Sequence, residues 1–323
     1  MKIDFHAHLF PRPFLDEVTR RKLEFRLPGM PLSIFPKMYD LEERLRDMER
    51  MGIDMQALSL GPPGAEVGSA LDEVALTKLW NDEIAEVVQH DPRHFTGLAA
   101  LPMQVPDEAV RELDRAIGEL HLRGAQIFSN AAGKTLDAPD FWPVYERAQE
   151  LDVPIFIHPN TPVCTTGMLD FGLLIMLALP VDTSLAAARL VMSGVMEKYP
   201  RLKIVLAHLG AVLPYLIGRF DVSAETLARI SPGYDLRISR PPSFYFKRFY
   251  MDTVSNHAPA YYCAHMTSGA DKIVLGSDYP YARWDLAVEE IERLELPAAD
   301  KEKIYGENAV QLLKLPTASS VAG

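Results

Sequence analysis

The sequence predicts an α/β protein, a single (β/α)8 barrel of the TIM type with a long loop insertion after its first strand. Two observations predict this fold class. Eight short apolar runs alternate with helical patterns along the chain, the signature of βα units around a parallel sheet. The chain has 323 residues, of which 48% are hydrophobic, and no linker or repeat divides it. We expect the barrel to span residues 1–315 and residues 316–323 to form a frayed tail.

The first strand is predicted at Lys2–His8, where Ile3 and Phe5 alternate with His6 and His8. Two histidines two residues apart on a strand point the same way, so both imidazoles can reach one metal ion. A polar barrel interior or a chance pair is the alternative interpretation. The choice between them depends on whether the rest of the chain supplies further ligands.

The segment after this strand, residues 11–39, is rich in Pro, Arg and Phe and too long for a simple βα loop. We expect it to form a lid or a substrate wall. Asp40 can then cap a helix at Leu41–Met51, which Gly52 ends.

Mostly apolar runs bounded by turn residues mark the later strands, and amphipathic stretches mark the later helices. The strands are predicted at Asp54–Leu60, Phe95–Leu101, Gly124–Phe128, Pro154–His158, Lys203–His208, Phe249–Val254 and Lys272–Asp278. The helices are predicted at Ser69–His90, Pro106–Leu120, Pro139–Leu151, Asp182–Tyr199, Asp285–Leu294 and Asp300–Leu313, with a long loop at Asn160–Leu179.

Composition excludes several classes of protein. The net charge of −11 argues against nucleic acid or an anionic membrane as a partner, although a small anionic substrate needs only local arginines. No uninterrupted apolar run is long enough to span a bilayer, and the most apolar stretch, Phe171–Pro180, is followed by Asp182. Cys164 and Cys263 are the only cysteines, so a cytoplasmic setting without a disulfide framework fits best.

Three further predicted strands end in a residue that can bind metal or move protons: His158, His208 and Asp278. In a parallel barrel the carboxyl ends of all strands lie on one face, so these side chains should converge with His6 and His8. Each residue alone is more often a simple hydrogen-bonding group. Together they favour a functional site.

These residues carry a family resemblance. The set His6-x-His8, His158, His208 and Asp278 resembles the amidohydrolase superfamily, and more narrowly the branch of metal-dependent decarboxylases that includes α-amino-β-carboxymuconate-ε-semialdehyde decarboxylase. Further matching motifs run over nearly the whole chain. They include Met1-Lys2-Ile3-Asp4, Arg44-x-x-x-Met48-x-x-x-Gly52-Ile53, Val195-x-Glu197-Lys198-Tyr199-Pro200, Ala207-His208-x-Gly210 and Gly276-Ser277-Asp278-Tyr279-Pro280.

The resemblance implies one divalent metal held by His6, His8, His158 and Asp278, with a water in an open position. Neutral imidazoles and a carboxylate suit Zn²⁺, our first expectation, and Mn²⁺ is the alternative. Binuclear relatives use a lysine at the end of strand four. The corresponding run, residues 125–130, contains no lysine, so we expect a single ion.

The resemblance also implies roles in catalysis. His208 corresponds to an unliganded catalytic histidine, although a fourth metal-ligating imidazole is the alternative, and Asp278 can double as proton acceptor. Arg219 matches an arginine that crosses a dimer interface to hold a substrate carboxylate, and a solvated surface arginine is the alternative. The apolar run Phe171–Leu179 points to the same homodimer, unless it packs beneath its own loop.

We therefore expect a homodimeric, non-oxidative decarboxylase of a small unsaturated or aromatic carboxylic acid that uses a metal-activated water and His208. Residues 27–36 contain no arginine to match the family's second substrate arginine, which favours an aromatic acid. One alternative is a hydrolase or hydratase acting on a lactone, an ester or a C=C bond at the same site. Another is a non-catalytic binder of a carboxylated metabolite.

Overall fold

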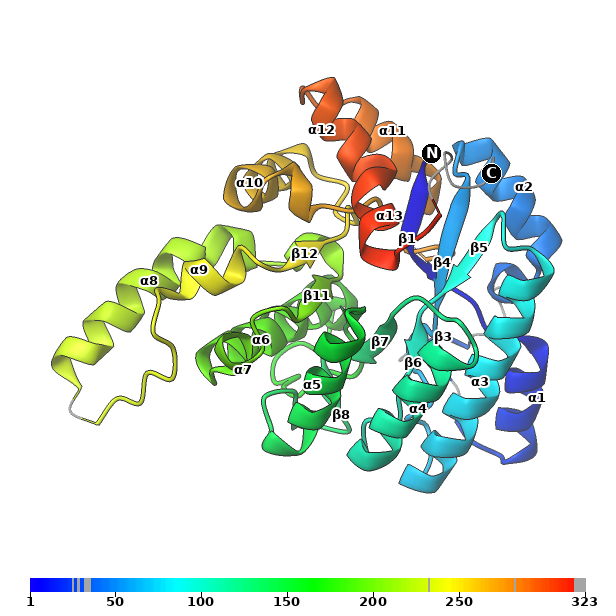
Figure 1. Ribbon diagram of the computed structural model, residues 1–323, viewed down its shortest axis with the longest axis horizontal. Helices are drawn as coiled ribbons and strands as arrows, with labels where there is room; N and C mark the ends of the chain where they lie inside the picture. The colour runs from blue at the N-terminus through cyan, green and yellow to red at the C-terminus, as the bar shows by residue number, and fades with distance from the viewer. Residues whose placement is uncertain (25, 28–29, 32–35, 232, 282, 317–323) are drawn as a thin grey trace.

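The computed structural model describes residues 1–24, 26–27, 30–31, 36–231, 233–281 and 283–316. Parallel strands surround a central axis (Figure 1), and neighbours pair in the order in which they occur in the chain. They are β1 (Ile3–His8), β4 (Met55–Ser59), β5 (Phe95–Gly97), β6 (Ala99–Ala100), β7 (Ala125–Phe128), β10 (Pro154–His158), β11 (Lys203–Leu206) and β12 (Tyr250–Met251).

The strand pairing around the barrel is interrupted at two places, and single hydrogen bonds or isolated bridges connect the strands there. Between β5 and β6, the Leu98 amide donates to the Leu58 carbonyl at 2.9 Å, so the third strand joins the two sheets. The predicted strand Lys272–Asp278 pairs only through isolated bridges, at Ile273 to β12 and at Tyr279 to β1. These contacts close the barrel. The predicted (β/α)8 fold is confirmed.

The barrel interior is filled by alternate residues of its strands, as the period of two requires. Fully buried members of this inner cluster are Ile3, Phe5, Ala57, Leu98, Phe156, Val205, Ala207 and Val274. The opposite faces of the strands pack against the helices in a second, larger cluster. The interior is therefore a packed core, and functional side chains are left to the strand ends.

Helices cover the outside of the barrel (Figure 1). They are α1 (Arg12–Arg20), α2 (Leu41–Met51), α3 (Ala70–His90), α4 (Pro106–Gly118), α5 (Trp142–Leu151), α6 (Leu179–Met192), α7 (Val195–Lys198), α8 (Leu213–Ile230), α9 (Pro242–Phe246), α10 (Ala258–Ser268), α11 (Ala287–Glu292), α12 (Ala298–Glu302) and α13 (Asn308–Leu313). Short pairs β2 (Arg26–Leu27) with β3 (Met30–Pro31) and β8 (Asn130–Ala131) with β9 (Lys134–Thr135) lie outside the barrel ladder.

Local end signals place the early helices correctly. Asp40 caps α2 by accepting a hydrogen bond from the Glu43 amide at 2.9 Å, and Gly52 ends the helix in the left-handed region at φ 67°. Ser69 and Asp72 form a capping box at the start of α3. The predictions for both helices are confirmed.

The structure differs from the predicted elements in three places. The insertion after β1 contains a helix, α1, within the long loop segment predicted to form a lid or a substrate wall. The predicted helix Asp182–Tyr199 is split at Gly194, which has φ 88°, and its first half starts earlier, after a π-helical turn at Leu174–Ala178. Helices α8, α9 and α10 were not predicted. The tail beyond residue 316 lies outside the described residues.

One helical stretch, Leu174–Met192, is long and apolar enough to cross a bilayer by length and composition alone, with a mean hydropathy of 1.7. Core helices of soluble proteins pass the same test. Asp182 lies inside this stretch, 3% exposed, and accepts hydrogen bonds from Ser129, from Asn130 at 3.0 Å and from the Val163 amide at 3.0 Å. These contacts fasten the helix to the barrel.

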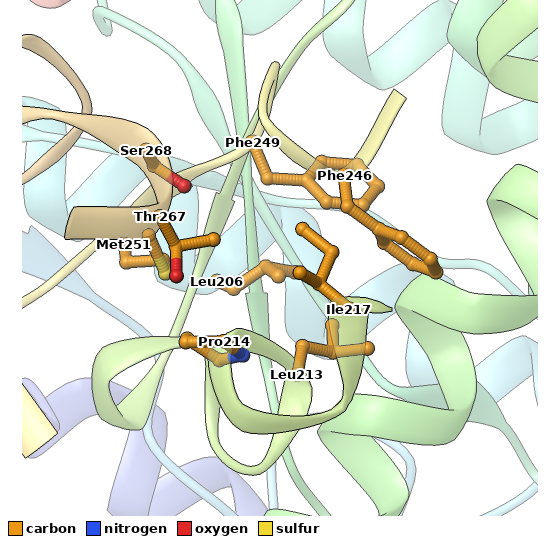
Figure 2. A pocket seen from close by; sticks show the side chains of 9 residues that line it. All are labelled: Leu206, Leu213, Pro214, Ile217, Phe246, Phe249, Met251, Thr267 and Ser268. Atoms are coloured by element: carbon orange, nitrogen blue, oxygen red, sulfur yellow. The ribbon is translucent and has the colours of Figure 1, made fainter. Parts of the chain in front are cut away.

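Helices α8 and α9 extend from the barrel as an arm (Figure 1). At its base, Leu213, Ile217 and Phe246 meet Leu206 and Met251 around a small apolar pocket (Figure 2). Large apolar side chains are exposed on the two helices of the arm, namely Tyr215, Val222, Leu227, Ile230 and Phe244. A second exposed apolar group lies near the start of α6, at Leu169, Phe171, Ile175, Met176 and Leu177.

Two glutamates line a small cavity between α3 and the barrel, with room for about one water molecule. Burial raises the pKa of Glu73 to about 7. Burial, together with the charge of Glu73, raises the pKa of Glu66 to about 8. No described lysine or arginine forms an ion pair with either carboxylate.

This burial predicts a pH-dependent stability. A carboxyl group with a raised folded pKa stabilises the fold while it is protonated, and that stability is lost as the pH rises from the unfolded pKa through the folded one. Glu73→Gln should therefore be more stable than the parent protein at pH 8, by about 1–3 kcal/mol, and no more stable at pH 5. Urea unfolding at both pH values measures the difference. If the difference in unfolding free energy between Glu73→Gln and the parent protein is the same at both pH values, the raised pKa of Glu73 is contradicted.

Candidate metal centre and active site

The carboxyl ends of the strands bring together the five side chains that the sequence predicts to converge. His6 and His8 come from β1, His158 from β10, His208 from the turn after β11, and Asp278 from the segment that closes the barrel. The Nε2 atoms of His6 and His8 lie 3.0 Å apart. The Asp278 Oδ1 atom lies 3.1 Å from Nε2 of His6, 3.2 Å from that of His8 and 4.0 Å from that of His158.

The other ring nitrogen of each of these three histidines has its own partner. His6 Nδ1 lies 2.6 Å from Asp252 Oδ2, and His158 Nδ1 lies 2.7 Å from the Pro159 carbonyl. Both partners only accept, so Nδ1 carries the proton and Nε2 keeps its lone pair. His8 Nδ1 lies 3.1 Å from the Ser59 hydroxyl. This is the outer hydrogen bonding that metal-ligating histidines usually have.

Three buried side-chain atoms in the cluster lack a hydrogen bond: Nε2 of His158, Oδ1 of Asp278 and Nδ1 of His208. Unsatisfied buried polar atoms are costly, and the first two face the same small region as Nε2 of His6 and His8. A divalent cation in that region would satisfy all four. Imidazole nitrogens and one carboxylate are ligands that suit both Zn²⁺ and Mn²⁺. The residues present fit a metal ion.

The protonation states of His8 and His158 agree with this fit. Burial lowers the pKa of His8 to about 4 and that of His158 well below its usual value, so both imidazoles are neutral and can ligate. Burial acts in the same direction on His6, but the charges of Asp278 and Asp252 outweigh it and raise its pKa to about 10. Without a metal this ring is therefore protonated at both nitrogens, and metal binding must release the proton on Nε2. Burial opposes ionisation of Asp278, yet the neighbouring histidines outweigh it and hold the pKa of that carboxyl well below its usual range.

His208 occupies a different side of Asp278. Its Nε2 lies 3.8 Å from Oδ2, the second carboxylate oxygen, and its side chain is 20% exposed whereas those of His6 and His8 are fully buried. Ligand atoms of His6, His158, His208 and Asp278 all lie within 4.8 Å of one another. Distances alone therefore allow two ligand sets, which differ in whether His8 or His208 is the fourth member.

Buried polar residues behind β1 were not predicted as part of the site. Asp4 accepts hydrogen bonds from Gln56 at 2.9 Å and from the Ser277 hydroxyl at 2.5 Å. Arg44, fully buried, donates to the Gln56 side chain and to the His8 carbonyl, and lies 4.4 Å from the centre of the Tyr279 ring. This network ties the strand of His6 and His8 to the segment of Asp278.

Aromatic groups and a tight turn form walls beside the histidines. The Tyr281 ring lies 5.6 Å from that of His8, and the Phe128 ring lies 6.4 Å from that of His158. Gly61 begins the turn after β4, and a Cβ atom there would come within 3.0 Å of the His8 ring. Only glycine lets the backbone pass so close. Flat aromatic walls suit a planar ligand.

Arg219 is not connected to the cluster within one chain. It is exposed on α8 and forms no hydrogen bond or ion pair with another described residue. The apolar segment 27–36, which lacks the second substrate arginine, lies largely outside the described residues. Asp252 was missed because it lies inside the predicted strand Phe249–Val254, whereas the structure ends β12 at Met251 and makes Asp252 a strand-end residue.

Comparison with known proteins agrees with this geometry. A family model described as amidohydrolase matches residues 3–315. The 2-amino-3-carboxymuconate-6-semialdehyde decarboxylase of Dictyostelium discoideum is 31% identical, with 98% of this chain and 92% of that protein covered.

Two solved structures share the fold over nearly their whole length. The 5-carboxyvanillate decarboxylase of Sphingomonas paucimobilis has a TM-score of 0.90 and 27% identity, covering 98% of this chain and 99% of the other. A dihydroxybenzoic acid decarboxylase of Polaromonas sp., solved with bound manganese and the inhibitor 2-nitroresorcinol, has a TM-score of 0.85 and 31% identity, covering 100% and 99%. The chain therefore belongs to the amidohydrolase family.

Proposed function

We propose that this protein is a metal-dependent, non-oxidative decarboxylase of a small aromatic or unsaturated carboxylic acid. The observation that carries the proposal is the convergence of His6, His8, His158 and Asp278, with His208 beside them, at the strand ends. The decarboxylases to which the chain is similar act on aromatic or muconate-type acids, and the aromatic walls of this site suit such a substrate.

In this proposal the metal ligands are Nε2 of His6, His8 and His158 and Oδ1 of Asp278. His8 is preferred to His208 because its Nε2 approaches the same carboxylate oxygen as the other two and because it is neutral and fully buried. Zn²⁺ remains the ion suggested by ligand type, and the manganese of the Polaromonas enzyme makes Mn²⁺ the ion to test beside it. A bound ion would supply Lewis-acid polarisation of substrate oxygens or water.

His208 and Asp278 are the groups that would handle protons. Loss of CO₂ leaves an electron pair on the carbon that carried the carboxylate, and that carbon must gain one proton. His208 Nε2 faces Oδ2 of Asp278 at 3.8 Å, and its partly exposed ring can exchange protons with solvent. His208 would deliver the proton, and Asp278 would hold the imidazole in place.

The test is a product assay on the purified, metal-loaded protein. A panel of hydroxybenzoic, methoxylated and muconate-type acids should include at least one that releases CO₂ and yields the corresponding decarboxylated product. Hydrated or ring-opened products without CO₂ would instead indicate a hydratase or hydrolase. Binding without turnover across the panel would indicate a non-catalytic role.

Metal removal gives a second expected result. Dialysis against a chelator should abolish CO₂ release, and adding Zn²⁺ or Mn²⁺ should restore it, since the ligand atoms are a preformed set. Metal analysis should then show about one ion per chain, as expected for three histidines and one carboxylate. Full activity in the metal-free protein would contradict the proposal.

We also propose that the enzyme is a cytoplasmic homodimer in which Arg219 reaches the partner's active site to bind the substrate carboxylate. The support is an arginine that pairs with no other described residue, on an arm that exposes apolar side chains such as Tyr215 at 84%, together with the exposed apolar group that includes Phe171 at 88%. Apolar area of this kind usually marks an interface. Residues 1–315 would form the single catalytic domain.

Mixed subunits test the role of Arg219. Arg219→Ala should raise KM for the acid about 10–100-fold, the loss expected for one charge-assisted hydrogen bond, without changing metal content. At an acid concentration below the KM of the parent enzyme, where each variant alone is nearly inactive, heterodimers of Arg219→Ala and His208→Ala chains should regain one working site, which combines His208 of one chain with Arg219 of the other. Arg229→Ala, exposed on the same helix, is the matched control and should have no effect. Inactive heterodimers, or a fully active monomer, would contradict the proposal.

A further inference from the structure

Asp252 follows β12 and is fully buried, with both carboxylate oxygens engaged. Oδ2 lies 2.6 Å from Nδ1 of His6. Oδ1 accepts hydrogen bonds from the Leu209 amide at 2.9 Å and from the Val254 amide at 3.0 Å. No lysine or arginine among the described residues pairs with this carboxylate. Its negative charge therefore faces the imidazole of His6 on one side and the turn at Leu209 on the other.

The partner of Nδ1 of His6 differs in charge from the Nδ1 partners of His8 on β1 and His158 on β10. His8 has a neutral hydroxyl beside Nδ1, from Ser59, and His158 has a backbone carbonyl. Of these three histidines, only His6 has a carboxylate beside Nδ1. A carboxylate holds the proton on Nδ1, leaves Nε2 free, and makes the ring a stronger electron donor. Asp252 thus fixes both the tautomer and the orientation of His6.

The contact with Leu209 acts on the turn that carries His208. His208 and Leu209 both lie in the left-handed region, at φ 55° and 56°, where residues with a Cβ atom are strained and need outside support. Asp252 supplies one support through the Leu209 amide. Met251, the preceding residue, packs closely against the same turn, since a Cβ atom on Gly210 would come within 2.6 Å of its sulfur.

Close packing holds Asp252 in this position. A Cβ atom on Gly276 would come within 2.9 Å of the Cβ of Asp252 and 3.0 Å of that of His6. The missing side chain lets β1, β12 and the closing segment approach each other at this level. Asp252 therefore has little freedom to break either contact without moving a strand.

We propose that Asp252 is a positioning residue that couples His6 to the turn of His208, so that one carboxylate sets both a metal ligand and the proton-handling histidine. The inference rests on the proposed function for the roles of His6 and His208. It adds a physical link between them, through Oδ2 on one side and Oδ1 on the other.

Asp252→Asn tests the link, since asparagine keeps the shape but removes the charge and one acceptor. Metal affinity, measured by competition with a chromophoric chelator, should fall about 10–100-fold, and the visible spectrum of the Co²⁺-loaded protein should change. Amides of residues 208–211 should exchange faster with deuterium. In the metal-loaded protein kcat should fall by more than KM changes.

Ser59→Ala is the matched control, because it removes the partner of His8 and touches nothing in the turn of His208. It should weaken metal binding without changing exchange at residues 208–211. Metal affinity and amide exchange need no substrate, so they distinguish this inference from the proposed decarboxylation. Unchanged exchange in Asp252→Asn would overturn the coupling even where metal affinity falls, and unchanged affinity would overturn the role at His6.

The native protein provides the same test if Asp252→Asn does not fold. Removing the metal frees His6, so exchange at residues 208–211 should rise if Asp252 transmits the change. The turn at Gly194, which carries no ligand, should show no difference. Equal exchange at residues 208–211 with and without metal would overturn the coupling.

Discussion

Replacing Asp278 by alanine is expected to remove the metal and abolish CO₂ release. Oδ1 of Asp278 is the atom on which three imidazoles converge, at 3.1, 3.2 and 4.0 Å. Without this carboxylate, the buried cation would be held by three imidazole nitrogens and would contact no negative charge directly. Asp252 would remain, but it contacts Nδ1 of His6 and not the cation itself. Metal content measured on the purified variant should fall from about one ion per chain to near zero, and activity should fall below detection.

His158→Ala should give the same paired loss, because Nε2 of His158 is one of the unsatisfied buried atoms of the cluster and faces Oδ1 of Asp278. Asp300→Ala is a suitable control. Asp300 also lies beside a histidine, His265 at 2.8 Å, but on partly exposed helices outside the cluster. It should keep its metal and activity. Stoichiometric metal in both Asp278→Ala and His158→Ala would refute the ligand assignment.

The convergence of the five site residues could be predicted because it depends only on topology. In a parallel barrel the carboxyl ends of all strands meet on one face, so a histidine or aspartate at the end of an apolar run is placed without knowing any other contact. Even Asp278 was placed correctly, although its segment forms only isolated bridges. At Asp278 the φ angle is 58°, so the backbone leaves strand geometry at this residue. The apolar pattern of the sequence gives no sign of this change.

The arm could not be predicted from periodicity. Helix α8 carries apolar side chains on its exposed side, including Tyr215, Val222 and Ile230, so it lacks the single apolar stripe of a helix packed on a barrel. Helix α1 was missed for another reason: it lacks a side-chain cap and lies in a Pro-rich segment, although Pro13 in its first turn and the buried pair Phe14 and Val18 are helix signals.

The residues that support the site were also beyond sequence reasoning. Asp252 is one of 44 acidic residues, and what distinguishes it is the 2.6 Å contact with His6, 246 positions away. Arg44 was noted as part of a motif, but its burial against Tyr279 depends on closure of the barrel. Hydrogen-bond partners of this kind are set by tertiary packing, and strand-end patterns identify only the residues that face the opening.

His208→Ala decides between the two ligand sets that the distances allow. If His208 handles protons, the variant should keep about one metal ion per chain and lose about 10²–10⁴-fold in kcat, the usual contribution of a general acid or base. The reason is positional: Nε2 of His208 faces Oδ2 of Asp278 at 3.8 Å and its ring is partly exposed, whereas Nε2 of His8 faces Oδ1 at 3.2 Å in full burial.

The comparison variant is His8→Ala, which should lose metal and activity together. His257→Ala, an exposed histidine outside the cluster, should change neither and controls for loss of an imidazole. Metal content by mass spectrometry and kcat by CO₂ release separate the outcomes. Loss of metal from His208→Ala with retention in His8→Ala would move His208 into the ligand set, because the ion would then be held by His6, His158, His208 and Asp278, whose ligand atoms also lie within 4.8 Å of one another.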